Sequence, residues 1–145
     1  MKIEEYLKAS PIFALFQAQQ ASQKYLRESL AEEGVNFLEA LLLISLLMEG
    51  KNTVMPGELS KSFACSKANI SKMLSRLEED DLIERSISLE DARSFELSLS
   101  ATGLMKANRL MKLVGSLELS IEKAWGAKKV GNFVAQLDEL GQFTS

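Results

Sequence analysis

Histidine is absent from this 145-residue sequence, and cysteine occurs once, as Cys65. The absence of histidine removes both the commonest general base and the commonest zinc ligand. A single cysteine excludes an intramolecular disulfide, which fits a reducing compartment. The sequence also lacks a phosphate-binding loop, a GxGxxG motif and any cluster of metal-ligand residues. We therefore expect neither an enzyme nor a protein that carries a metal or a cofactor.

Long hydrophobic runs are also missing. The longest run, ALLLISLLM at 40–48, has about half the length that a membrane-spanning helix needs, and it favours a buried helix. The first ten residues, MKIEEYLKAS, are polar and acidic and lack the basic and apolar regions of a signal peptide. These features predict a cytoplasmic protein with no membrane partner.

The composition is that of an ordinary globular protein, with 46% hydrophobic and 26% charged residues. The length is typical of one domain, so we expect residues 1–145 to form a single domain. The net charge of -3 argues against general attraction to nucleic acid, but it leaves room for a local basic patch.

Apolar spacing and capping residues predict helices along most of the chain. The first helix covers 4–30 and is bent or broken near its start by Pro11. The second begins at a capping box formed by Asn36 and Glu39, and a short third helix begins at Pro56. Ser66 is the expected N-cap of a helix at 67–80, and the remaining expected helices cover 101–125 and 127–140.

The hydrophobic period changes to two between 94 and 99, where alternate residues are apolar. Residues 82–87 form the expected partner strand. The segment 88–93 has no glycine or proline, so it predicts a loop longer than a two-residue turn. The predicted order is three or four helices, a β-hairpin and two further helices.

The expected helix 67–80 has two different faces. Its core stripe, spaced at three and four residues, consists of Ile70, Met73, Leu74 and Leu77. Its opposite face is small or cationic and carries Ala68, Ser71, Lys72, Ser75 and Arg76, with Lys67 and Asn69 beside it. Asparagine can pair with adenine, and lysine or arginine with guanine, in a major groove. The alternative for this face is ordinary solvated surface.

Four acidic residues follow this cationic face, at 78–81. Acidic side chains at a helix C-terminus oppose the helix dipole, so they need another reason to be there. Electrostatic repulsion that disfavours wrong docking poses is one interpretation, and solubility is the more favoured one.

A helix, a turn, a helix with small residues and a β-hairpin, in that order, are typical of a winged helix-turn-helix. The stretch PGELSKSFACSKANISKMLSRLEEDDLIER followed by SISLEDARSFELSLSATG resembles the MarR family of winged helix-turn-helix transcriptional regulators. The resemblance implies a mainly α fold with a small β-hairpin wing. In such a fold, a DNA-binding lobe at 35–100 is flanked by dimerisation helices at 1–34 and 101–145.

The resemblance also assigns the DNA contacts. It implies that the helix from Lys67 is the recognition helix and that these residues face double-stranded DNA: Ser66, Lys67, Ala68, Asn69, Ser71, Lys72 and Arg76. In the wing, Asp91 and Arg93 match the family's Asp-x-Arg, in which the Asp braces the wing and the Arg enters the minor groove. The alternative for this pair is a surface ion pair of little energetic value. Family wings often carry Asp and Arg where this chain has Ser88 and Ala92, so the wing offers fewer contacts.

The resemblance further implies a homodimeric repressor that reads a palindromic site. Both ends of the chain carry apolar residues that would form the dimer or, alternatively, complete a monomer core: Ile12, Phe13, Phe16, Trp125, Phe133, Val134, Leu137, Leu140 and Phe143. Many family members bind a small aromatic or anionic effector, which nothing in this sequence identifies.

Two alternatives remain open. The acidic composition and the reduced wing would also suit a winged helix that has lost DNA binding and binds proteins. Cys65, in the turn before the recognition helix, is more typical of a small core residue than of a redox switch.

Overall fold

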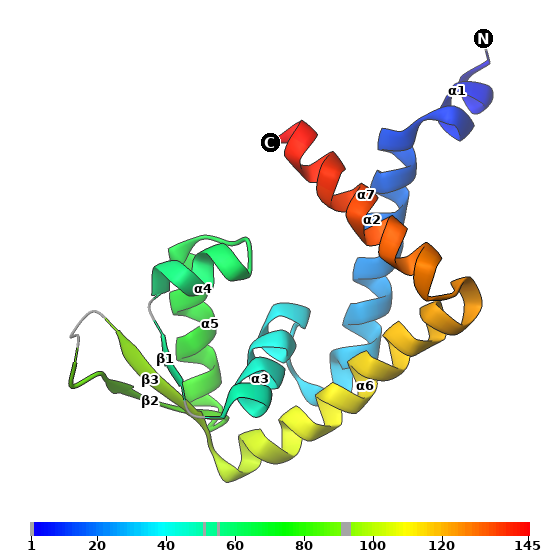
Figure 1. The fold of residues 1–145 in the computed structure, drawn as a ribbon. Coiled ribbons are helices and arrows are strands. Elements are labelled where there is room, and N and C mark those ends of the chain that lie inside the picture. The colour runs from blue at the N-terminus through cyan, green and yellow to red at the C-terminus, as the bar shows by residue number, and fades with distance from the viewer. Residues whose placement is uncertain (1, 51, 55, 91–93) are drawn as a thin grey trace. The chain divides into compact units, whose positions relative to one another are not determined.

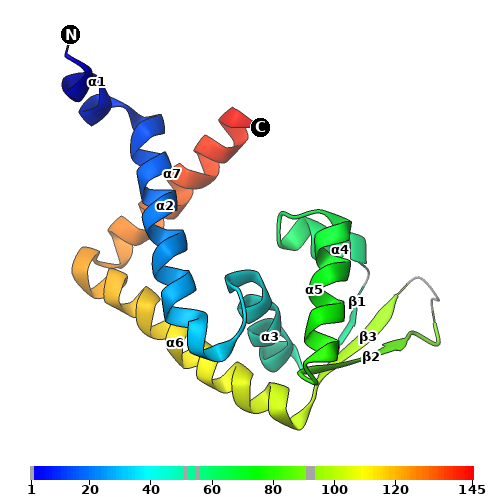
Figure 2. The same ribbon diagram turned by 180° about the vertical axis from the view of Figure 1, so that it is seen from behind.

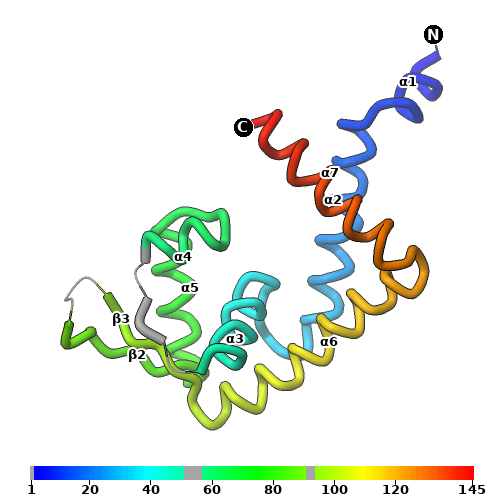
Figure 3. Tube along the Cα trace, viewed as in Figure 1, coloured from blue at the N-terminus to red at the C-terminus, as the bar shows by residue number. Residues whose placement is uncertain are grey.

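The computed structural model describes residues 2–50, 52–54, 56–90 and 94–145 (Figure 1), and Figure 3 follows the same chain as a tube. The chain divides into two compact units, residues 1–107 and 108–145. The first unit contains all three strands and every helix up to the beginning of α6 (Figure 1). That residues 1–145 form a single domain stays a prediction.

Pro11 separates the first two helices. The predicted helix over 4–30 is α1, Ile3–Ala9, followed by α2, Pro11–Leu30. Ser10 lies between them in an extended conformation, which is favoured for a residue before proline. The Ser10 hydroxyl accepts a hydrogen bond from the Phe13 N–H at 3.1 Å and so caps α2. The proline therefore breaks the helix and begins the next one.

The capping box at Asn36 and Glu39 is confirmed. The 3-10 helix η1, Ala31–Glu33, ends at Gly34, whose φ of 68° is left-handed. Helix α3, Phe37–Glu49, begins with the Glu39 N–H donating to Asn36 Oδ1 at 2.9 Å and the Asn36 N–H donating to Glu39 Oε1 at 3.1 Å. In the apolar run after the box, Ala40, Leu42, Leu43 and Leu46 are buried.

The sheet has three antiparallel strands in the order β1-β3-β2: β1 Asn52–Val54, β2 Ile83–Ile87 and β3 Phe95–Leu99. In the hairpin, Ile83 pairs with Leu99 and Ile87 with Phe95, so the predicted hairpin is confirmed. Strand β1, which pairs with β3, was not predicted. Three residues are too few to show a period of two, and their strand conformation depends on the partner strand.

Helices α4, Pro56–Ser62, and α5, Lys67–Glu79, pack against each other, while α3 packs on β3 and α5 on β2. Figure 2 shows α3 and α5 near the sheet from the opposite side. The core between these elements is formed by completely or almost completely buried side chains: Leu42, Leu43, Ile70, Leu74, Leu77, Leu82, Ile83 and Leu97.

The first turn of α6, Ala101–Trp125, lies directly against the beginning of the hairpin. The Ser100 N–H donates to the Leu82 carbonyl at 3.1 Å, and the Ser100 hydroxyl accepts from the Gly103 N–H at 2.9 Å. A Cβ at Gly103 would lie 1.8 Å from the Leu82 carbonyl oxygen. Glycine is therefore required here because the two backbones approach closely.

Within the second unit, α6 turns into α7, Ala127–Thr144, at Gly126, whose φ is 84°. Trp125 and Phe133 pack edge to face with ring centroids 5.2 Å apart, and the Lys129 ammonium lies 4.7 Å from the centre of the Trp125 ring. These contacts hold the corner between the two helices. Helix α7 extends four residues beyond the predicted end at 140.

Candidate nucleic-acid interface

The turn between α4 and α5 is fixed by backbone and hydroxyl hydrogen bonds. The Cys65 N–H donates to the Ser60 carbonyl at 3.1 Å, and the Ser60 hydroxyl donates back to the Cys65 carbonyl. Ala64 adopts a left-handed φ of 50°. Ser66 then caps α5, because its hydroxyl accepts from the Asn69 N–H at 3.1 Å. The predicted N-cap is confirmed, and the turn sets the direction in which α5 leaves α4.

The two predicted faces of α5 are both present. The core stripe is buried, with Ile70, Leu74 and Leu77 at most 1% exposed. The exposed side contains all seven residues predicted on the recognition helix: Ser66, Lys67, Ala68, Asn69, Ser71, Lys72 and Arg76. Small side chains between the two lysines allow this surface to approach a partner closely. That these residues contact DNA stays a prediction.

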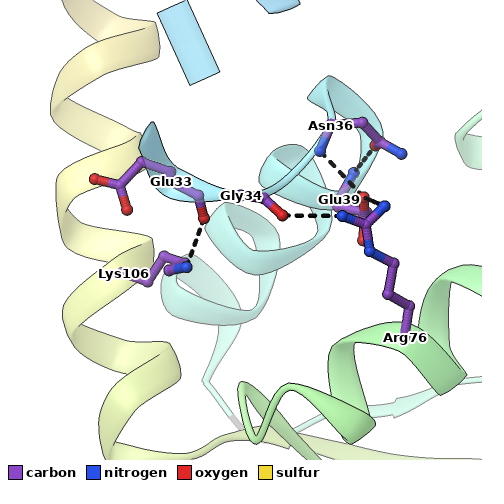
Figure 4. A network of polar contacts seen from close by, with 6 residues as sticks. All are labelled: Glu33, Gly34, Asn36, Glu39, Arg76 and Lys106. Atoms are coloured by element: carbon purple, nitrogen blue, oxygen red, sulfur yellow. Dashed lines mark hydrogen bonds and ion pairs between the residues drawn. The ribbon is translucent and has the colours of Figure 1, made fainter. Parts of the chain in front are cut away.

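Arg76 differs from the two lysines because its guanidinium has partners inside the protein (Figure 4). Its Nη1 lies 3.2 Å from Glu39 Oε1, and its Nη2 donates to the Gly34 carbonyl at 3.0 Å. The Arg76 side chain is 54% exposed, whereas the Glu39 side chain is 1% exposed. Arg76 therefore has an ion pair and a hydrogen bond within the protein that the sequence did not predict.

The acidic end of α5 also has structural partners. Glu78 forms an ion pair with Arg85 of β2, with Oε2 lying 3.3 Å from the arginine Nε. The Arg85 guanidinium also lies 5.1 Å from the centre of the Phe95 ring. Asp81 has a left-handed φ of 56°, a conformation in which aspartate is enriched. Solubility is therefore an incomplete explanation of the acidic run, since Glu78 connects α5 to β2 and Asp81 makes the turn between them.

The wing is the hairpin of β2 and β3. Ser88 is buried, donates its N–H to the Ser94 carbonyl at 3.1 Å, and accepts the Glu90 N–H on its hydroxyl at 3.2 Å. A serine hydroxyl can brace a turn in the same way as an aspartate carboxylate. Asp91 and Arg93 lie outside the described residues, so the prediction that they brace the wing and enter the minor groove stays untested.

Comparison with known proteins finds a family match in the same part of the chain. The sequence model of the MarR family matches residues 39–95. A Bacillus subtilis (strain 168) protein described as the uncharacterized HTH-type transcriptional regulator YdcH is 31% identical over 134 residues, which cover 90% of this chain and 89% of that protein. This chain belongs to the MarR family. It is a transcriptional regulator with a winged helix-turn-helix fold.

Solved structures share the fold of this MarR-family regulator. The S. aureus MepR–DNA complex has a TM-score of 0.79 at 14% identity and covers 94% of this chain and 99% of that chain. A mutant MarR from E. coli complexed with operator DNA has a TM-score of 0.73 at 22% identity and covers 97% and 99%. The predicted fold class, mainly α with a β-hairpin wing, is confirmed.

Two negative observations apply to the described part of this MarR-family chain. No helix in it is long and apolar enough to cross a membrane. No group of three or more His, Cys, Asp or Glu side chains in it could hold a metal ion. Cys65 is a half-buried free thiol, and a redox role for it stays a prediction.

Sequence reasoning missed Glu39 and Gly34 as neighbours of α5. Glu39 was predicted only as a capping residue, and that local role is real. Its ion pair with Arg76 connects residues 37 positions apart, a distance over which periodicity and capping motifs carry no signal.

Proposed function

We propose that this MarR-family regulator is a homodimeric repressor that binds a two-fold symmetric duplex site. In this proposal α5 enters the major groove and the β2–β3 hairpin lies at the adjacent minor groove. The exposed face of α5 carries the proposal. It presents small residues together with Lys67 and Lys72, neither of which pairs with an acid in the part of the chain that the structure describes. Related folds solved with DNA support the assignment.

The chemistry of this face suits a major groove. Lys67 and Lys72 can donate to guanine or to phosphate oxygens, and the Asn69 amide can pair with adenine. Ala68 and Ser71 leave space for close approach. These residues lie in the first two turns of α5, where the capped helix N-terminus adds a favourable dipole for phosphate. Sequence selectivity would come from Asn69 and the lysines, and affinity from their phosphate contacts.

Dimerisation is proposed because apolar side chains are exposed at both ends of the chain. In α1 and α2 they include Ile3, Tyr6, Ile12 and Phe16, each more than half exposed. In α7 they include Phe133, Val134, Leu137 and Phe143. Large exposed apolar surfaces mark interaction sites, and a second copy of the chain would cover both sets. Sedimentation that shows a monomer at micromolar concentration would contradict a dimer.

The decisive experiment is fluorescence anisotropy with the duplex from upstream of the protein's own gene and a scrambled duplex, across a salt series. We expect selective binding that weakens with salt by about 0.9 logarithmic units per tenfold salt for each phosphate contact. Lys72→Met should reduce the steepness of that salt dependence by about 0.9, the contribution of one phosphate contact. Lys24→Met, an equal charge loss on α2, should leave it unchanged. Arg93→Ala should weaken binding if the wing enters the minor groove.

Absence of DNA binding would point to a different function. A folded dimer that binds neither duplex at any salt concentration would indicate a winged helix that recognises protein, as the acidic composition allows. We also propose a small aromatic or anionic effector on the family resemblance alone. A thermal-shift screen with aromatic carboxylates tests it, and an unchanged melting temperature throughout would remove it.

A further inference from the structure

Glu39 combines two functions that do not need the same chemistry. As the third residue of α3 it accepts the Asn36 N–H at 3.1 Å, and a neutral glutamine can fill that place in a capping box equally well. Yet its side chain is only 1% exposed, and Oε2 has no hydrogen-bond partner among the described residues. Burying a carboxylate is costly unless it is paired. The cap does not require a charged side chain at position 39, so the ion pair with Arg76 is the reason for a glutamate there.

Arg76 is bound by two groups of one short segment, 34–39. Its two terminal nitrogens reach the Gly34 carbonyl at 3.0 Å and Glu39 Oε1 at 3.2 Å (Figure 4). A planar guanidinium can hold two acceptors at once, whereas a lysine ammonium on its flexible stem cannot reproduce this geometry. From the other side, the Lys106 ammonium of α6 donates to the Glu33 carbonyl. Residues 33–39 are thus attached to both α5 and α6.

Because Arg76 lies far from the N-terminal end of α5, a small change of helix direction at Arg76 would move that end by a large distance. Arg76 lies in the C-terminal half of the helix, and Lys67 lies about 14 Å away at 1.5 Å per residue. A tilt of about 5° at Arg76 would displace Lys67 by about 1 Å over that length. Hydrogen bonds to base edges tolerate less than this, because their donor–acceptor distances lie within a few tenths of an ångström. Holding Arg76 would therefore fix the reading end of the helix.

We propose that Glu39 is a positioning residue for DNA recognition, and that it acts by holding Arg76 so that α5 keeps one orientation. This rests on the proposed function of α5 as the DNA-reading helix. Arg76 then contributes to affinity through the orientation of α5 and not through a phosphate contact. The two roles predict different salt dependence, because only a phosphate contact releases a counterion.

The test measures duplex affinity across a salt series for Glu39→Gln, Arg76→Lys and Arg76→Met, with Lys72→Met as the control. Glu39→Gln keeps the cap, and Arg76→Lys keeps the charge but loses the two-acceptor geometry. We expect all three to bind about tenfold more weakly than wild type, comparable to the loss of one base contact, with an unchanged salt slope. Combining Glu39→Gln with Arg76→Met should cost little more than either change alone. Lys72→Met should lower the slope by about 0.9.

Other results would overturn the proposal. Wild-type affinity in Arg76→Lys together with a slope lowered by about 0.9 in Arg76→Met would identify a phosphate contact. Fully additive effects of Glu39→Gln and Arg76→Met would show that the two residues act separately. If Glu39→Gln does not fold, Arg76→Lys and Arg76→Met still distinguish the two roles.

A second measurement does not depend on DNA. Hydrogen exchange of the free protein should rise in the last two turns of α5 and in residues 34–39 for Glu39→Gln and Arg76→Met, but not for Lys72→Met. Unchanged exchange in these segments would refute the positioning role whatever the DNA result. A wild-type protein that binds no duplex would instead refute the proposed function, and the exchange data would still decide whether the pair fixes α5.

Discussion

Replacing Gly103 with alanine should destabilise the protein, although alanine is the better helix former. The added Cβ would lie 1.8 Å from the Leu82 carbonyl oxygen and 2.8 Å from its carbon. Both are backbone atoms, so no side chain can rotate away. To restore an ordinary van der Waals distance, the first turn of α6 or the beginning of β2 must move by more than about 1 Å. The hydrogen bond from Ser100 to the same carbonyl, 3.1 Å long, would be strained by that movement.

The expected magnitude follows from opposing effects. Overpacking of this kind costs about 1–3 kcal/mol, and a weakened backbone hydrogen bond costs about 1 kcal/mol more. The helix propensity of alanine offsets about 1 kcal/mol. We therefore expect a net loss of about 1–3 kcal/mol, which for a chain of this size lowers the melting temperature by about 3–10 °C.

The assay is thermal and urea unfolding followed by circular dichroism at a fixed protein concentration, because a dimer makes the melting temperature concentration-dependent. Gly57→Ala is the matched control, since a Cβ there would meet only the Lys67 side chain, at 3.6 Å. We expect this control to melt within about 2 °C of wild type, since unstrained changes cost at most about 0.5 kcal/mol. A Gly103→Ala protein as stable as the control would refute the close-approach argument.

Three further changes test other parts of the lobe by urea unfolding. Ser66→Ala removes the N-cap of α5 and should cost about 1 kcal/mol of unfolding free energy, whereas Ser66→Thr should keep most of that stability. A Ser66→Ala protein as stable as wild type would contradict the cap. Leu97→Ala empties a fully buried position and should cost about 2–5 kcal/mol, so a cost below 1 kcal/mol would contradict its place in the core. The coupling between Glu78 and Arg85 in a double-mutant cycle should be at most about 1 kcal/mol and should shrink with added salt.

Local signals in the sequence located most helix ends. The serine before Lys67 and the pair Asn36 and Glu39 were recognised as caps, and both caps are formed. Such signals are reliable because a capping side chain bonds to backbone groups within three residues of itself. The amphipathic pattern likewise identified the buried stripe of α5, because the helical repeat places its members on one side whatever they contact.

Contacts between distant segments were beyond the reach of these signals. Strand β1 exists because β3 offers it hydrogen-bonding partners, and three residues cannot show a strand pattern alone. Glu78 pairs with Arg85 of β2, a residue of another element that no local pattern in the sequence connects to it. The homodimer, which depends on contacts between two chains, stays a proposal.

The sequence by itself determined where α5 begins, which side of it is buried and which small and cationic residues remain outside. These properties depend on side chains a few residues apart on one helix, and the helical repeat alone places them. Only the tertiary structure decided that Arg76, which the family resemblance predicts to face DNA, is held by Glu39 and Gly34. The physical reason is that a buried carboxylate needs a cationic partner, and folding alone determines which cation reaches it.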